Sequence, residues 1–256
     1  THVIMNPPFT LVNAASTCDW AKGLVNHAGI FFQRFITSAE PNTKISAILP
    51  DVLRAGTRYR RWRELLEKVC TIDSITIAGR FGPFADVDVF MLHARRQAGV
   101  RTQTARWWTE TAGKTIGDFF DVNVGSVVPH RDALRGRNTP FFDSGCTPVW
   151  SILDRPKRWR KHGGRLFMPP FVVLRRTSSP SDLKRAYASV IAIGSEAAVE
   201  NHLLVLTPKD GELTTCRRLM KWLYGSNASR WLNKRIRCRH LTVGAVSKIP
   251  FSKGIA

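Results

Sequence analysis

Short apolar runs alternate with longer stretches of helical periodicity along the first hundred residues of the chain. Strands are predicted at residues 3–5, 45–50, 75–78 and 87–92. Helices are predicted at residues 14–37 and 58–69, the second with arginines on the face opposite Trp62 and Leu66. Prolines stop the first two strands, because proline supplies no N–H to a strand ladder. This order of elements predicts an α/β sheet whose functional edge lies at the carboxyl ends of its strands.

The pattern changes after the fourth predicted strand. Residues 97–115 are polar, with arginine and threonine interleaved, and are predicted to be a linker. Further strands are predicted at residues 171–174, 189–193 and 203–206, and a helical stretch at 213–237. We therefore expect two domains, with boundaries at residues 1–105 and 106–256.

Charge points to a polyanionic partner. The 256 residues carry 39 Lys and Arg against 19 Asp and Glu, a net charge of +20. Such a surplus favours nucleic acid first, and an anionic membrane or the ribosome second. Residues 155–176 and 213–256 contain no acidic residue. The candidate DNA-binding residues are Arg155, Lys157, Arg158, Arg160, Lys161, Arg165, Arg217, Arg218, Lys221, Arg235, Arg237 and Arg239.

Most of these cations are expected to contact phosphates, and a few to reach guanine edges. Trp150 and Trp159 lie in or beside the first acid-free segment and are candidates for stacking or wedging against bases, or for partly buried packing. His130 is assigned no catalytic role.

Several function classes are disfavoured. The five cysteines are odd in number and form no C-x-x-C pair, which indicates neither a disulfide framework nor a zinc site, and no metal is expected. Reduced thiols suit a cytoplasmic protein. No run reaches the roughly 20 apolar residues of a membrane span, and the first residues lack a signal-peptide layout.

The segment Asn6-Pro7-Pro8-Phe9 carries a specific chemistry. The exocyclic amine of a nucleobase is a poor nucleophile, because its lone pair is delocalised into the ring. The Asn6 side-chain carbonyl and the Pro7 backbone carbonyl are suited to accept its two N–H bonds, while the prolines hold the backbone rigid. Phe9 offers a flat face for a base that has left the duplex, a contact worth roughly 1–3 kcal/mol. The alternative interpretation is that these four residues form an ordinary turn after a strand and have no role in binding a base.

This motif resembles the Asn-Pro-Pro-aromatic motif of S-adenosylmethionine-dependent N6-adenine DNA methyltransferases of restriction-modification or phage-defence type, in the subgroup whose target recognition domain follows the catalytic domain. Residues 45–50 with Gly56 and 60–66 are similar to the family's strand-proline-helix segment. Residues 79–84 leading into 87–92 look like its last strand pair. Residues 203–208, 223–226 and 241–250 resemble target recognition domains.

The resemblance implies the C-terminal half of a Rossmann-like methyltransferase sheet followed by an α+β target recognition domain. It implies catalytic roles for Asn6, Pro7, Pro8 and Phe9, and a second wall of the base pocket at Phe81, or alternatively at Phe84. It also implies direct in-line methyl transfer from S-adenosylmethionine to a flipped adenine in sequence-specific duplex DNA. The family's Gly-rich donor-binding loop lies upstream of the motif and has no counterpart among these residues.

We therefore expect the donor-binding half to come from a longer form of the chain or from another polypeptide, with a nuclease subunit as a further possible partner. Two alternatives stay open. The chain is a non-catalytic DNA-binding or specificity module, or it is a methyltransferase acting on RNA or on protein glutamine, since those enzymes carry similar tetrapeptides.

Overall fold

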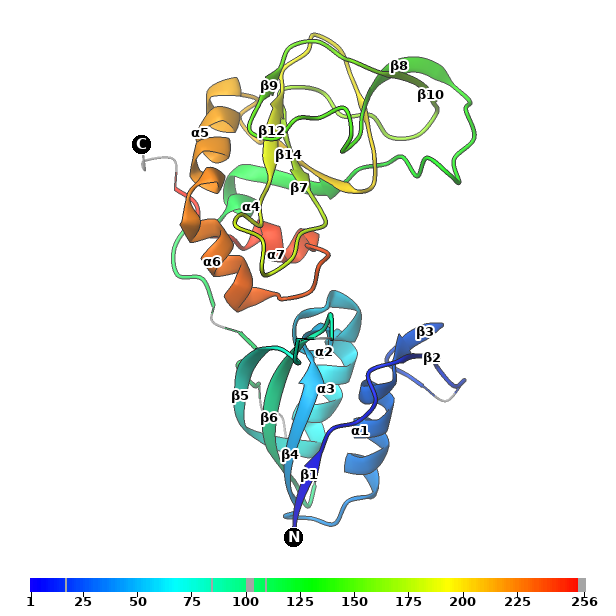
Figure 1. Ribbon diagram of the computed structural model, residues 1–256, viewed down its shortest axis with the longest axis vertical. Coiled ribbons are helices and arrows are strands. Elements are labelled where there is room, and N and C mark those ends of the chain that lie inside the picture. Colours follow the sequence, from blue (N-terminus) through cyan, green and yellow to red (C-terminus); the bar gives the residue numbers. More distant parts are fainter. Residues whose placement is uncertain (17, 84, 100–103, 109, 253–256) are drawn as a thin grey trace. The chain divides into compact units, whose positions relative to one another are not determined.

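The computed structural model describes residues 1–16, 18–83, 85–99, 104–108 and 110–252 (Figure 1). These residues divide into two compact units. The first unit is Thr1–Thr109 with Lys234–Cys238, and the second is Glu110–Asn233 with Arg239–Ala256. The structure therefore places a short segment from near the C-terminus in the first unit, in addition to the residues that the sequence grouped there.

A four-stranded sheet forms the centre of the first unit. Its order is β1 (His2–Met5), β4 (Lys44–Pro50), β6 (Asp88–Arg96) and β5 (Cys70–Arg80). β1 pairs with β4 in parallel, and β6 runs antiparallel to both β4 and β5. The four predicted strands are confirmed, and with the helices they confirm the mixed α/β class.

Helices α1 (His27–Ser38) and α3 (Arg60–Val69) lie on one side of this sheet (Figure 1). The shorter α2 (Asp51–Ala55) and the 3₁₀ turn η1 (Thr57–Tyr59) connect β4 to α3. Phe32 and Trp62 pack with their rings 6.0 Å apart in the buried core. On the other side of the sheet Ile4 is 81% exposed.

The helix predicted at residues 14–37 is wrong in its first half. β2 (Leu11–Asn13) and β3 (Leu24–Asn26) form an antiparallel hairpin there, and α1 starts only at His27. Gly23 adopts φ +67°, a left-handed conformation through which an α-helix cannot continue. The Asn26 side chain caps the start of α1 by accepting a hydrogen bond from the Ala28 N–H.

Two further sequence interpretations are corrected. Trp107, assigned to the linker, is buried in the first unit and donates from Nε1 to Glu67 over 2.7 Å. Arg63, assigned to the polar face of its helix, is also buried and donates to the Leu53 carbonyl over 2.8 Å. Burial lowers the pKa of Arg63 to about 10, against the opposing effect of Glu67. Polar groups within this core are held by side-chain and main-chain partners, which composition does not reveal.

The second unit holds two sheets. Five strands pair in the order β7 (Phe120–Val124), β14 (Leu203–Pro208), β11 (Phe171–Arg175), β12 (Ala188–Ile191) and β9 (Ile152–Leu153). Three strands pair in the order β10 (Trp159–His162), β8 (Arg137–Phe142) and β13 (Ala198–Val199). The helices are α4 (Ile116–Phe119), α5 (Leu213–Tyr224), α6 (Ser226–Arg235) and α7 (Val243–Ser247).

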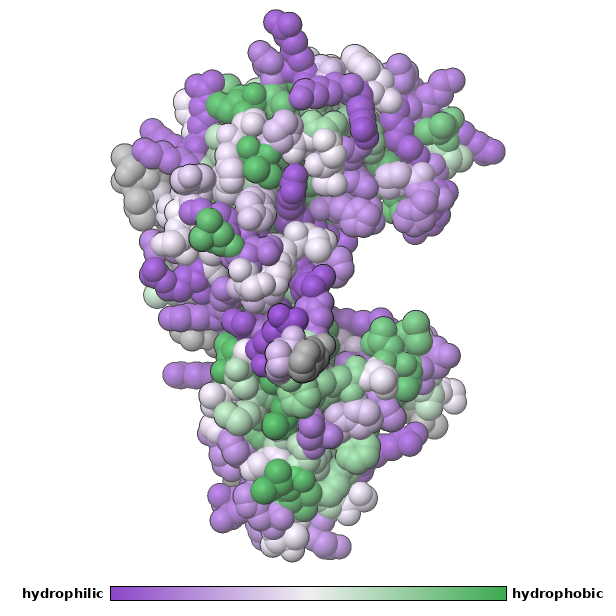
Figure 2. Space-filling model, viewed as in Figure 1, coloured by the Kyte–Doolittle hydropathy of each residue, from purple (hydrophilic) through white to green (hydrophobic). Residues whose placement is uncertain are grey.

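The three apolar strands predicted in this half are confirmed as β11, β12 and β14. The helical stretch predicted at residues 213–237 is confirmed as the two helices α5 and α6, which separate where Gly225 is extended at the end of α5. β8 and β10 were not predicted, since they are polar or basic along much of their length. On the face shown in Figure 2, hydrophobic atoms gather over parts of the first unit, whereas much of the second is hydrophilic.

Within the described ranges, no helix has the length and apolar character needed to cross a bilayer. The five cysteines are free thiols. Among the same residues, His, Cys, Asp and Glu side chains nowhere gather in the groups of three that hold a metal ion.

Candidate functional site

The segment from Asn6 to Phe9 leaves the carboxyl end of β1. Pro7 is buried, Asn6 and Pro8 are exposed, and Phe9 is half-buried against the core of the first unit. In the described part of the chain the Asn6 side chain makes no hydrogen bond. The structure thus presents a free amide on a backbone stiffened by two prolines, at the edge where a parallel pair of strands ends.

A buried asparagine fixes the backbone of this segment. Asn26 Nδ2 donates to the Phe9 carbonyl over 2.9 Å, and the Asn26 backbone N–H donates to the Tyr59 hydroxyl over 2.9 Å. Burial raises the pKa of Tyr59, so the hydroxyl stays neutral. The His27 N–H also donates to the Thr10 carbonyl over 2.8 Å. Sequence reasoning missed Asn26, although an Asn before an apolar periodic stretch is a helix N-cap signal.

The structure brings Phe9 and Phe81 together. Their ring centroids lie 5.2 Å apart with 73° between the planes, an edge-to-face contact. Phe81 is 38% exposed, and its N–H donates to the Val87 carbonyl over 2.9 Å. A base stacked between two rings needs roughly 7 Å between their planes, twice the usual carbon contact distance. Base entry therefore requires Phe81 to move. Phe84, the alternative wall, lies outside the described residues.

The basic residues predicted to bind DNA separate into two groups. Arg160 lies on the second unit and is half-buried. The other candidates on the second unit have exposed side chains: Arg155, Lys157, Arg158, Lys161, Arg165, Arg217, Arg218, Lys221 and Arg239. Arg235 and Arg237 belong instead to the first unit.

Arg235 and Arg237 are engaged inside the first unit. The Arg235 guanidinium lies 3.5 Å from the centroid of the Trp108 ring, and burial lowers its pKa to about 10, with further lowering by Arg54 and Arg63. Arg237 Nε lies 2.5 Å from Asp88 Oδ1. Arg235 is therefore packed on a ring and Arg237 is held in an ion pair, both within the first unit.

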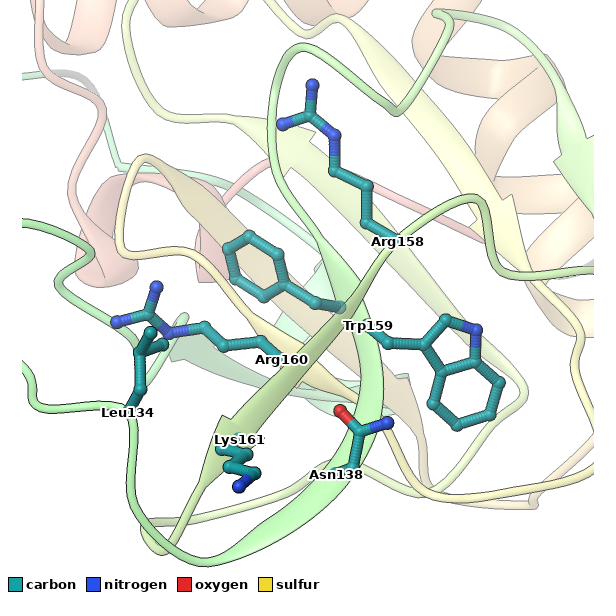
Figure 3. Close-up of a pocket in the computed structure, with 7 residues that line it drawn as sticks. Leu134, Asn138, Arg158, Trp159, Arg160 and Lys161 are labelled. Atoms are coloured by element: carbon teal, nitrogen blue, oxygen red, sulfur yellow. The ribbon is translucent and has the colours of Figure 1, made fainter.

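Arg160 and Lys161 lie on β10, which pairs antiparallel with β8 to form a ribbon over residues 137–140 and 159–162 (Figure 3), whereas Arg217, Arg218 and Lys221 lie on α5. An open pocket of ≈ 580 Å³ adjoins the ribbon, with Asn138, Trp159 and Lys161 in its lining. Trp159 is 56% exposed, and its indole makes no ring contact or hydrogen bond within the described part of the chain. Trp150, by contrast, packs edge-on against Tyr224 at 5.1 Å.

No family model and no curated protein matches the chain. Among solved structures, it is similar to the type I restriction enzyme EcoKI M protein, with 22% identity and a TM-score of 0.31 over 37% of this chain and 20% of that chain. It is similar to the HsdS subunit from Thermoanaerobacter tengcongensis, with 15% identity and a TM-score of 0.37 over 53% of this chain and 31% of that chain.

A third similarity is to the type IIG restriction endonuclease BpuSI, with 12% identity and a TM-score of 0.32 over 89% of this chain and 42% of that chain. The chain thus spans less than half the length of each of these three proteins. At these TM-scores the function has to be argued from this chain's own residues.

Proposed function

We propose that the first unit holds a flipped adenine for methylation of its N6 amine, and that the second unit binds the duplex DNA that carries it. The observation that carries this proposal is the free Asn6 amide on a proline-stiffened loop, beside the Phe9 and Phe81 rings. The parallel ends of β1 and β4, next to the antiparallel β6, also support it as half of a Rossmann-like sheet.

Each residue has a distinct part in the proposal. Asn6 Oδ1 and the Pro7 carbonyl accept the two N–H bonds of the amine, which turns its lone pair toward the incoming methyl group. Neither proline has an N–H to compete for these acceptors. Phe9 stacks on one face of the base and Phe81 swings out to take the other. Asn26 is a positioning residue, because it holds the Phe9 carbonyl.

The described residues do not fit a donor site. S-adenosylmethionine binding in the resembling family uses N–H groups of a Gly-rich loop and an acidic side chain, whereas β1 is followed by Asn6-Pro7-Pro8 and β4 ends in Pro50. The acidic residue nearest those ends, Asp51, is 2% exposed and is bonded to Arg54 and to the Arg237 N–H. We propose that polypeptide outside these 256 residues holds the donor.

The test is methyl transfer to adenine in duplex DNA by a preparation that supplies the donor-binding polypeptide. Asn6→Ala is expected to lower the rate by about two orders of magnitude, as for other single preorganised hydrogen-bonding groups, with DNA affinity unchanged. Asn13→Ala, an exposed asparagine on β2, is the matched control. Full activity of Asn6→Ala would remove the mechanism.

A second candidate function is a non-catalytic DNA-binding or specificity module, which the poor fit to a donor and the exposed basic residues favour. The methyl-transfer assay described above separates the two, since transfer to adenine that depends on Asn6 excludes a non-catalytic module. Binding of duplex DNA in preference to RNA across a salt series counts against a methyltransferase acting on RNA or glutamine.

A further inference from the structure

The two faces of the β8–β10 ribbon differ in their contacts. Successive side chains of a strand point to opposite faces, so Arg160 lies on one face and Trp159 and Lys161 on the other, as Figure 3 shows for Arg160 and Trp159. Arg160 Nη2 donates to the carbonyls of Asp132 over 2.8 Å and Pro129 over 3.3 Å. The Arg160 face is therefore packed against the unit.

Further contacts fix the packed face. His162 is buried and lies 3.3 Å from the Ser126 hydroxyl. The Arg158 guanidinium pairs with Asp143 Oδ2 over 2.5 Å. Gly136 adopts φ +92°, and a Cβ there would lie 2.6 Å from the His162 carbonyl oxygen, so the ribbon closes only around a glycine. These contacts hold the ribbon as a stiff element.

The opposite face is open. Asn138 and Lys161 are directly paired across the two strands, and Trp159 is paired with Pro140 one step along. Asn138, Trp159 and Lys161 are exposed and make no side-chain hydrogen bond within the described residues. An amide, an indole and an ammonium are thus presented side by side on one exposed face.

We propose that this open face of the β8–β10 ribbon reads base edges in the major groove of duplex DNA. The proposal rests on the proposed function. The major groove admits a two-stranded ribbon, and an asparagine amide there matches the N6 and N7 atoms of adenine. Asn138 is the specificity-determining residue, Trp159 makes the apolar contact with bases, and Lys161 contacts a phosphate or a guanine edge. Lys157 and Arg165 are also exposed and add positive charge, which attracts the phosphates of DNA.

Nucleic acid is favoured over a protein partner by charge. The segment 155–176 that carries β10 contains no acidic residue. Among nucleic acids, duplex DNA is favoured because the deep major groove of an RNA helix is too narrow for side chains to read.

The experiment begins by selecting duplexes from a randomised library with the purified 256-residue chain. Affinities for the selected site are then measured by fluorescence anisotropy across a salt series. Asn138→Ala is expected to lose about tenfold in discrimination at one base pair. Replacing the adenine of that pair with 7-deazaadenine is expected to weaken the wild type but not Asn138→Ala, since only the N7 acceptor is removed.

The other two residues have different signatures. Trp159→Ala is expected to weaken binding about equally at every salt concentration, and Trp159→Phe to retain most of the affinity, because an apolar contact releases no counterion. Lys161→Ala is expected to reduce the slope of log affinity against log salt by about one if it contacts a phosphate. Leu183→Ala, an 89% exposed apolar residue of the same unit, is the control. Thermal midpoints equal to the wild type show that each variant is folded.

The outcomes separate this inference from the function on which it rests. If the wild type selects a sequence and Asn138→Ala and Trp159→Ala select it with wild-type affinity, the ribbon assignment is wrong and the proposed function stands. If the wild type binds no duplex DNA, or binds RNA more tightly, both the ribbon assignment and DNA recognition by the second unit are wrong. Wild-type DNA binding with an inactive Asn6 site leaves the ribbon assignment standing.

Discussion

The buried arginines at the core of the first unit differ from the exposed cations at the β8–β10 ribbon of the second unit. Arg54 is 1% exposed, pairs with Asp51 over 2.6 Å and donates to main-chain carbonyls, including that of Trp107 over 3.0 Å. On the β8–β10 ribbon, Arg158 is 58% exposed even within its ion pair, and Lys161 is exposed without one. The same kind of side chain is part of the core around Arg54 and part of the surface at the ribbon, although the second unit also buries one arginine, Arg185, which is 0% exposed.

This difference separates charge that stabilises the fold from charge that is available to a partner. A buried guanidinium with carbonyl and carboxylate partners cross-links segments of the chain, and the Lys234–Cys238 segment is attached to the first unit in this way through the Arg54 side chain and the Asp51 carboxylate. An exposed cation adds little to stability and much to the electrostatic attraction of a polyanion.

The largest effect is expected from Asp51→Ala, which leaves the buried Arg54 guanidinium without its carboxylate. The cost is expected to be about 3–5 kcal/mol in the free energy of unfolding, as for other buried pairs that lose one partner. Urea unfolding followed by tryptophan fluorescence measures it. Arg60→Ala, which removes the exposed Arg60–Glu64 pair, is the control and is expected to change stability by at most about 0.5 kcal/mol.

An intermediate effect is expected from Arg237→Ala, compared directly with Lys161→Ala. Loss of the half-buried Arg237–Asp88 pair is expected to cost about 1.5–3 kcal/mol in unfolding free energy while the salt dependence of DNA binding stays as in the wild type. Lys161→Ala is expected to do the opposite, leaving stability within about 0.5 kcal/mol and lowering the salt slope. If both variants changed only DNA binding, the division into two kinds of charge would be wrong.

The smallest effect is expected in the pH dependence of stability, at the Arg158–Asp143 pair beside the β8–β10 ribbon. Burial alone would raise the pKa of Asp143, but hydrogen bonds from Cys146 and Arg158 bring it below its usual value. A carboxyl whose pKa is lowered in the folded state stabilises the fold above its unfolded pKa of about 3.9, and this contribution is lost as pH falls through the folded pKa. The urea midpoint of the wild type is therefore expected to approach that of Asp143→Asn below pH 4. A constant difference between the two proteins from pH 7 to pH 3 would contradict this.

The sequence by itself determined the elements whose signals are local. Each predicted apolar strand formed. A short apolar run is a signal that lies within a few adjacent residues, and in the first two strands a proline also marks where the strand stops. The helix at residues 58–69 was predicted nearly to its ends, as α3 and the preceding turn, because its apolar spacing is strong. The chemistry proposed for Asn6-Pro7-Pro8-Phe9 also rests on a local signal, since the motif is four adjacent residues.

Tertiary structure decided what depends on residues far apart in the chain. The contact between Phe9 and Phe81, and the hold of Asn26 on the Phe9 carbonyl, exist only once the sheet has formed. The packing of Arg235 on Trp108 has the same origin, whereas composition had grouped that arginine with the exposed cations. Charge and periodicity report what a residue is, but burial and hydrogen-bonding partners, set by long-range contacts, determine whether it supports the fold or faces a partner.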